Sequence, residues 1–125
     1  MIVGLGIDLL EVSSIRRALE SHGERFTDRV FTASEVADCR KRADRAQALG
    51  ARFAAKEACL KALGTGWAQG LGFQQVEVIR TDGGRPEIRL HGNAEARART
   101  LGVRAIHVSL THQRSMVAAV VVLED

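Results

Sequence analysis

Aromatic residues are scarce in this sequence: four phenylalanines, one tryptophan and no tyrosine make up 4% of its 125 residues. Such a composition offers few ring surfaces for the stacking of bases, on which single-stranded nucleic-acid binding usually depends. Basic residues exceed acidic ones by only 18 to 15, a formal net charge of +3. This excess is far below that of a strongly basic nucleic-acid-binding protein, so we expect no nucleic-acid partner.

Cysteine, proline and long apolar runs are also rare. Cys39 and Cys59 are too few for a disulfide scaffold and lack C-x-x-C spacing, so we expect a reducing, cytoplasmic location. The apolar runs at 1–10 and 116–123 are too short to span a bilayer. Asp8 and Glu11 interrupt the N-terminal segment, which argues against a signal peptide. Pro86 is the lone proline, and no linker is evident. We therefore predict one domain over residues 1–125, without membrane association.

Apolar periodicity predicts strands over 1–9, 73–80, 86–90, 105–111 and 115–123, and helices over 14–21, 32–42, 46–63 and 93–101. Ser13 or Ser14, Thr32 and Asn93 are the expected N-caps, and Glu35 completes a capping box with Thr32. Gly64 is suited to end a helix, and Asp82-Gly83-Gly84 is suited to a hairpin turn. Strands joined by tight turns pair antiparallel, so the predicted class is α+β with a small, mostly antiparallel sheet packed with helices.

Asp8 interrupts the first predicted strand. Alternation places it on the same face as Gly4 and Gly6, where a backbone or a ligand can approach closely. A carboxylate in an apolar strand is costly unless it is paired, protonated or bound to a metal. The simpler interpretation is that the strand ends at Leu9 and that Asp8 caps the following turn; this residue alone favours that interpretation.

The predicted helix 46–63 has two unlike sides. One side is a smooth surface of small residues suited to close packing: Ala54, Ala55, Ala58, Cys59 and Ala62. The other displays Glu57 between Lys56 and Lys61, two of only three lysines in the chain. A surface pair of Glu57 with Lys61, worth about 0.2–0.5 kcal/mol, explains this pattern and is favoured by it alone. The alternative is that Glu57 holds a divalent cation while a lysine neutralises phosphate.

Two histidines lie near the C terminus. His107 and Ser109 share one face of the strand 105–111, whereas His112 points to the other, which argues against one metal site containing both histidines. His107 and Ser109 could be a base and a nucleophile, but no G-x-S-x-G turn surrounds Ser109. A hydrogen-bonded, partly buried His107 is the favoured interpretation.

Together and in this order, these segments resemble the bacterial holo-[acyl-carrier-protein] synthase family of 4'-phosphopantetheinyl transferases. MIVGLGID at 1–8 resembles the opening of that family, and RFAAKEACLKALGTG at 52–66 resembles its signature. GRP at 84–86 and HVSLTH at 107–112 resemble its hairpin tip and its closing motif. The resemblance covers essentially the whole chain and implies the 4'-phosphopantetheinyl transferase fold.

The resemblance implies a Mg²⁺-dependent transfer of 4'-phosphopantetheine from coenzyme A to a serine of apo acyl carrier protein, with release of adenosine 3',5'-bisphosphate. The resemblance implies a role in fatty acid biosynthesis, and the sequence leaves open whether the carrier serves fatty-acid synthesis, polyketide assembly or both. The family's metal ligands correspond to Asp8 and Glu57, which with Lys61 form the implied catalytic set. Mg²⁺ takes only one or two protein carboxylates and completes its shell with water and substrate phosphate. A metal-bound water or Glu57 could accept the serine proton, and the resemblance leaves this open.

The resemblance also implies contacts with coenzyme A, and Lys61 is a better phosphate contact than Lys56. The implied coenzyme A contacts are Lys56, Lys61, Gly84, Arg85, Pro86, His107 and Ser109. The family typically forms a homotrimer with active sites shared between subunits. The strand 115–123 agrees loosely with this, because it is apolar on both faces and must be covered twice.

One position departs from the family pattern. Where the family usually has an arginine that helps to dock the acidic carrier protein, this chain has Ser14. Arg17 follows one turn later and could supply a similar charge. Between Arg16 and Lys56 ten basic residues face six acidic ones, a local excess of +4 that suits the steering of an acidic partner.

Two other functions compete with this one. A basic nucleic-acid-binding module is supported by the arginine content and a pI of about 9.4, but by no recognised motif. A carrier-binding relative with weakened catalysis is suggested by Ser14. It is disfavoured because Asp8, Glu57 and Lys61 are all present.

Overall fold

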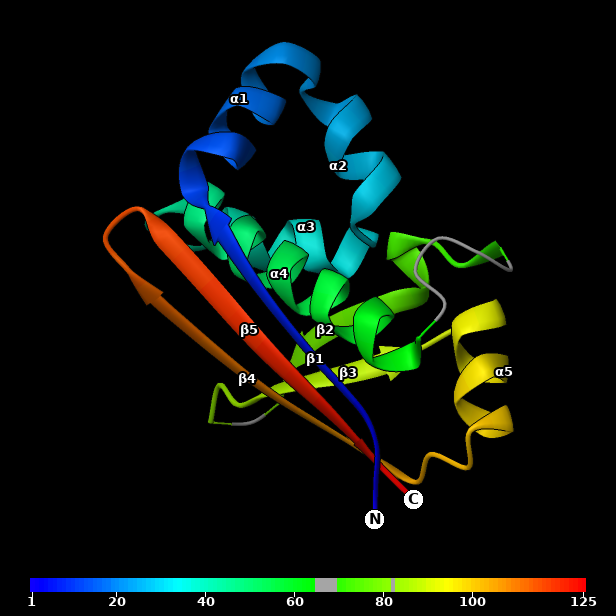
Figure 1. Cartoon of the computed structure of the whole chain (residues 1–125). Helices are drawn as coiled ribbons and strands as arrows, with labels where there is room; N and C mark the ends of the chain where they lie inside the picture. The colour runs from blue at the N-terminus through cyan, green and yellow to red at the C-terminus, as the bar shows by residue number, and fades with distance from the viewer. Residues whose placement is uncertain (65–69, 82) are drawn as a thin grey trace.

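The structure, a computed structural model, describes residues 1–64, 70–81 and 83–125 (Figure 1). The elements are β1 (Ile2–Glu11), α1 (Val12–His22), α2 (Glu24–Val30), α3 (Ala33–Arg40), α4 (Arg45–Leu63), the 3₁₀ helix η2 (Phe73–Gln75), β2 (Val76–Arg80), β3 (Pro86–Leu90), α5 (Gly92–Thr100), β4 (Ala105–Gln113) and β5 (Met116–Glu124). The strands form two antiparallel sheets, one of order β1-β5-β4 and one of β2 and β3. The predicted α+β class is confirmed.

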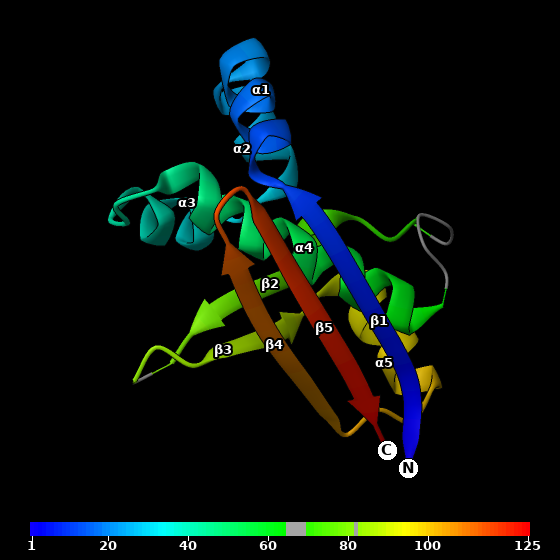
Figure 2. The ribbon, with the colours of Figure 1, turned by 60° about the vertical axis from the view of Figure 1, so that its left-hand side comes forward.

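Helix α4 crosses one face of the three-stranded sheet (Figure 2). It approaches β1 so closely that a Cβ atom on Gly4 or Gly6 would collide with the carbonyl oxygens of Ala62 and Ala58, respectively. Glycine is therefore required at both positions, as the alternation of β1 predicted.

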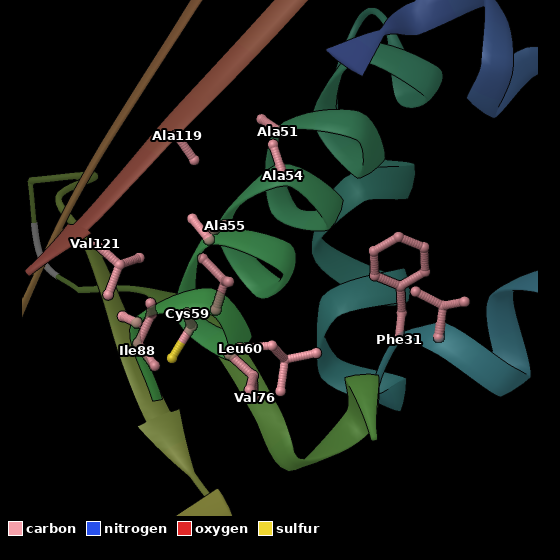
Figure 3. Packing of buried hydrophobic residues seen from close by; sticks show 14 of the residues in the cluster. Phe31, Ala51, Ala54, Ala55, Cys59, Leu60, Val76, Ile88, Ala119 and Val121 are labelled. Atoms are coloured by element: carbon pink, nitrogen blue, oxygen red, sulfur yellow. The ribbon is translucent and has the colours of Figure 1, made fainter. Parts of the chain in front are cut away.

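Ala51 and Ala55 of α4 lie on the side of β5, whereas Leu60 lies on the side of Val76 (Figure 3). Ala119 and Val121 of β5 lie on one side of the helix, and Phe31 and Val76 lie on the other. The predicted small-residue surface is fully buried, with Ala54, Ala55, Ala58 and Cys59 all 0% exposed. Helix α4 is thus the centre of the core rather than a cover over it.

Two predicted helix ends are confirmed. Thr32 Oγ1 accepts from Glu35 N at 3.3 Å, and Glu35 Oε1 accepts from Thr32 N at 2.9 Å, so α3 begins with a capping box. Helix α4 ends at Gly64, whose φ of 80° is in the left-handed region that glycine favours.

Two predicted N-caps are wrong. Helix α1 begins at Val12 with Glu11 as its N-cap, and the hydroxyl of Ser14 donates to the Glu11 carbonyl at 2.7 Å. The N-cap of α5 is His91 rather than Asn93, whose amide donates to the Gly70 carbonyl at 3.3 Å. In both places the hydroxyl or amide bonds to a carbonyl and does not accept from the helix N–H groups.

Among the described residues, the structure also adds the helices α2 and η2, the second of which shortens a predicted strand. The seven-residue α2 follows Gly23, whose φ is 54°, and is too short for its apolar spacing to stand out in the sequence. The strand predicted over 73–80 begins only at Val76, because η2 precedes it. The predicted turn residue Asp82 and the signature residues Thr65 and Gly66 lie outside the described residues. Within the described ranges, no helix has both the length and the apolar character needed to cross a membrane.

Candidate functional site

Asp8 lies inside β1, not at its end. It pairs with Ala119 of β5, and the strand continues to Glu11, so the interpretation of Asp8 as a turn cap is wrong. Its side chain is 16% exposed and lies beside α4. There Lys61 Nζ donates to Asp8 Oδ1 at 3.2 Å and to the Ile7 carbonyl at 3.0 Å.

Glu57 is half-buried on α4 close to the same ion pair. Burial raises the pKa of Glu57, the nearby negative charge of Asp8 raises it further, and the charge of Lys61 partly offsets this. The fold thus brings Asp8, Glu57 and Lys61 together between β1 and α4. Lys61 pairs with Asp8 across the two elements, so a simple surface pair with Glu57 does not account for its position.

The carboxylates of Asp8 and Glu57, which we call the carboxylate pair, fit a hard divalent cation. Carboxylate oxygens are ligands that Mg²⁺ prefers, and a cation would relieve the repulsion between the two charges. Within residues 1–64, 70–81 and 83–125 no group of three or more His, Cys, Asp or Glu side chains could hold a metal. The remaining ligands would therefore be water and substrate oxygens, which is the usual arrangement for Mg²⁺.

Lys56 has a different position from the one expected for a coenzyme A contact. Its side chain is 0% exposed, and its ammonium donates to Glu35 Oε1 at 2.7 Å and to the carbonyls of Phe73 and Val76. All three ammonium protons have acceptors within the chain. Lys56 thus has no open position for a phosphate in this arrangement, although Lys61, at 55% exposed, does.

The other predicted coenzyme A contacts lie away from the carboxylate pair. His107 and Ser109 project from the face of β4 opposite to α4, and His107 Nε2 lies 3.1 Å from Glu124 Oε1. Gly84, Arg85 and Pro86 lie where the chain turns from β2 into β3, and Arg80 Nη1 donates to the Gly84 carbonyl at 2.6 Å. Because β5 separates β1 from β4, one chain does not bring His107 and Ser109 to Asp8.

Glu77 is a polar centre that the sequence did not indicate. Its carboxylate accepts from the hydroxyls of Thr32 and Ser34, both at 2.7 Å, and lies 3.0 Å from His91 Nε2. These hydrogen bonds lower the pKa of Glu77 to about 2, and the two hydroxyls contribute most of this decrease. The partners come from two parts of the chain, 32–34 and 91, that are distant from Glu77 in the sequence, so no local spacing could have indicated them.

Comparison with known sequences gives one consistent result. The family model described as the 4'-phosphopantetheinyl transferase superfamily matches residues 4–121. The holo-[acyl-carrier-protein] synthase of Maridesulfovibrio salexigens is 46% identical over 124 residues, which cover 99% of each chain. That of Methylobacterium sp. is 51% identical and covers 99% of this chain and 95% of its own.

Comparison with solved structures agrees. The crystal structure of the Neisseria meningitidis holo-[acyl-carrier-protein] synthase superposes with a TM-score of 0.92 at 29% identity and covers 100% of both chains. The Helicobacter pylori synthase, crystallised in complex with coenzyme A, has a TM-score of 0.85 at 25% identity and covers 96% of this chain and 99% of its own. The fold predicted from the sequence resemblance is therefore confirmed over the whole chain.

Proposed function

The chain belongs to the 4'-phosphopantetheinyl transferase superfamily, and from this membership we propose that it transfers 4'-phosphopantetheine from coenzyme A to a serine of apo acyl carrier protein. It would thus act as a holo-[acyl-carrier-protein] synthase. The observation that carries the proposal is the carboxylate pair beside Lys61. Asp8 and Glu57 are far apart in the sequence, and the fold brings them together in a chain whose full-length relatives are synthases.

The reaction joins the serine oxygen to the phosphorus that carries pantetheine and breaks the bond to adenosine 3',5'-bisphosphate. Asp8 and Glu57 would hold Mg²⁺, which when bound supplies positive charge at the pyrophosphate of coenzyme A. Lys61, whose ammonium is held by Asp8 and the Ile7 carbonyl, would neutralise charge that develops on the phosphate oxygens. Either Glu57 or a water molecule held beside the carboxylate pair would accept the proton of the serine hydroxyl.

The proposal includes a homotrimer with shared active sites. The carboxylate pair is reached from one edge of the β1-β5-β4 sheet, and His107 and Ser109 lie at the other edge. Leu5, Ile7 and Leu9 on the outer face of β1 are 63–66% exposed, and an apolar hollow on the same face extends over β5 and β4. A neighbouring copy that covers this surface would bring its own His107 or hairpin tip toward Asp8.

The proposed partner is an acidic carrier protein that docks on α1 and α2. His22, Arg25, Phe26 and Arg29 line a shallow hollow at the junction of these helices. Arg17 lies on α1 one turn beyond Ser14, whose hydroxyl bonds to the Glu11 carbonyl. Several cations around an apolar ring suit a negatively charged protein surface.

A cytoplasmic location and a role in fatty acid biosynthesis are parts of the same proposal.

Mass spectrometry of an apo acyl carrier protein, incubated with coenzyme A and this chain, tests the proposal. We expect the carrier to gain the mass of one phosphopantetheine, adenosine 3',5'-bisphosphate to accumulate in equal amount, and both to require Mg²⁺. An unmodified carrier in the presence of Mg²⁺ would contradict the proposed activity. Equal modification after removal of divalent cations would contradict the role of the carboxylate pair.

A further inference from the structure

Lys56 and Glu35 form an ion pair whose two side chains are both 0% exposed. Lys56 Nζ donates to Glu35 Oε1 at 2.7 Å, to the Phe73 carbonyl at 3.1 Å and to the Val76 carbonyl at 2.5 Å. Glu35 in turn accepts from the backbone N–H of Thr32 at 2.9 Å and of Val78 at 2.8 Å. Every ammonium proton and both carboxylate oxygens are thus used within the chain.

Four elements meet at this ion pair. Glu35 is on α3, Lys56 is on α4, Phe73 is in η2, and Val76 and Val78 are on β2. One charged contact therefore joins the helix that carries Glu57 to the start of the β2–β3 hairpin. The tip of that hairpin, at Gly84–Pro86, is among the residues proposed to contact coenzyme A.

Stability is a weak explanation for a buried ion pair. The cost of removing two charges from water offsets much of their attraction, and apolar replacements of similar shape are often as stable. The pair instead fixes the orientation of α4 relative to α3 and β2, because five hydrogen bonds hold the ammonium of Lys56 and the carboxylate of Glu35 in place. The opposite side of α4 is a smooth surface of alanines, which allows a close approach but offers few interlocking side chains.

Glu57 follows Lys56 directly, so its side chain leaves the helix about 100° further around the axis. A small rotation of α4 that released Lys56 would turn Glu57 away from Asp8. We propose that the Lys56–Glu35 ion pair is a positioning device for the transfer reaction, which orients Glu57 toward Asp8 and sets the β2–β3 hairpin relative to it. This inference rests on the proposed function, and it makes Lys56 and Glu35 positioning residues that do not touch the substrate.

The double variant Glu35→Gln/Lys56→Met tests the inference, because it removes both charges and changes little volume. We expect a folded protein whose kcat falls about ten- to a hundredfold, the usual cost of misplacing a catalytic group by about 1 Å. Its KM for the carrier protein should change less than twofold, since none of the hydrogen bonds of the pair involves a residue of α1 or α2. Mn²⁺ binding in the presence of coenzyme A, followed by electron paramagnetic resonance, should weaken several-fold.

Leu123→Ala is the matched control, because it truncates a fully buried side chain on β5 that takes no part in the hydrogen bonds of the Lys56–Glu35 ion pair. It should lower the melting temperature while kcat and Mn²⁺ binding, measured well below that temperature, stay near those of the unmodified chain. If the double variant does not fold, Glu35→Gln alone is judged by the same criteria. A kcat and a Mn²⁺ affinity equal to those of the control would overturn the positioning role. An unmodified chain that transfers no phosphopantetheine would instead overturn the proposed function itself.

Discussion

Neighbouring residues of α4 have opposite environments. Lys56 is fully buried against Glu35, whereas Glu57 is half-buried beside Asp8. The sequence indicated that the helix has a small-residue side and a charged side, and it indicated the residues of the carboxylate pair. It could not indicate that Lys56 points inward, because its partner lies 21 residues earlier in a helix of its own. Helical periodicity says which residues share a side, but not which other elements cover that side.

Glu77 provides a prediction at the residue scale. Its pKa is about 2 in the folded chain against 4.5 ordinarily, so the folded state favours its charged form. That stabilisation is fully present above about pH 4.5, the ordinary value, and is lost as the pH falls toward 2. Glu77→Gln should therefore lower the free energy of unfolding at pH 7 by about 1 kcal/mol or more, since charge-assisted hydrogen bonds are lost.

Urea unfolding at a series of pH values measures this effect. The difference between Glu77→Gln and the unmodified chain should shrink steadily as the pH is lowered from 5 toward 2. Glu87→Gln on the neighbouring strand β3, at an exposed position, is the control and should be near-neutral throughout. A difference that stays constant across this range would mean that the charge of Glu77 does not stabilise the fold.

At the scale of elements, the distance between β1 and α4 determines whether the site exists. Asp8 and Glu57 come from these two elements, which pack backbone against backbone at Gly4 and Gly6. The glycines of the opening strand and the alanines of α4 were both readable from the sequence, and together they are the reason that the carboxylates meet. The helices α2 and η2 could not be predicted from the sequence, because neither is long enough to show the hydrophobic periodicity of a helix.

Two glycine-to-alanine substitutions test this packing and should act in opposite directions. Gly6→Ala should lower the free energy of unfolding by about 1–3 kcal/mol or more, because its Cβ would collide with the Ala58 carbonyl. Gly50→Ala in α4 should be neutral or stabilising by up to about 1 kcal/mol, because alanine favours the helix and its Cβ would meet only ordinary contacts at 3.5 Å. Thermal unfolding of both variants checks the prediction. Equal melting temperatures would show that β1 can move away from α4 without cost.

At the scale of the whole molecule, the residues of the proposed site are divided between two edges of one sheet. The carboxylate pair is beside β1, and His107 projects from β4 with β5 between them. The sequence resemblance named both sets of residues but not this division, which depends on strand order. The side chains of Leu5, Ile7 and Leu9 leave an exposed apolar surface on the outer face of β1, which is the surface that another copy would cover in the proposed trimer.

Ile7→Arg tests this role of the outer face. Ile7 is 66% exposed and lines the apolar hollow, so the substitution should leave the fold of a single chain intact while preventing association. We expect sedimentation to show a monomer in place of a trimer and the transfer rate to fall at least tenfold. Glu95→Arg, an exposed substitution on α5, should keep both the trimer and the rate. An Ile7→Arg monomer with full activity would show that one chain contains a complete site.

The most direct test of the whole account is the mass of an apo acyl carrier protein after incubation with coenzyme A, Mg²⁺ and either the unmodified chain or Glu57→Gln. This substitution keeps the volume of the side chain and removes the charge that, with Asp8, would hold the metal. We predict one added phosphopantetheine with the unmodified chain, and at least a hundredfold less with Glu57→Gln at an unchanged circular dichroism spectrum. Equal modification of the carrier by both proteins would contradict the central role of the carboxylate pair.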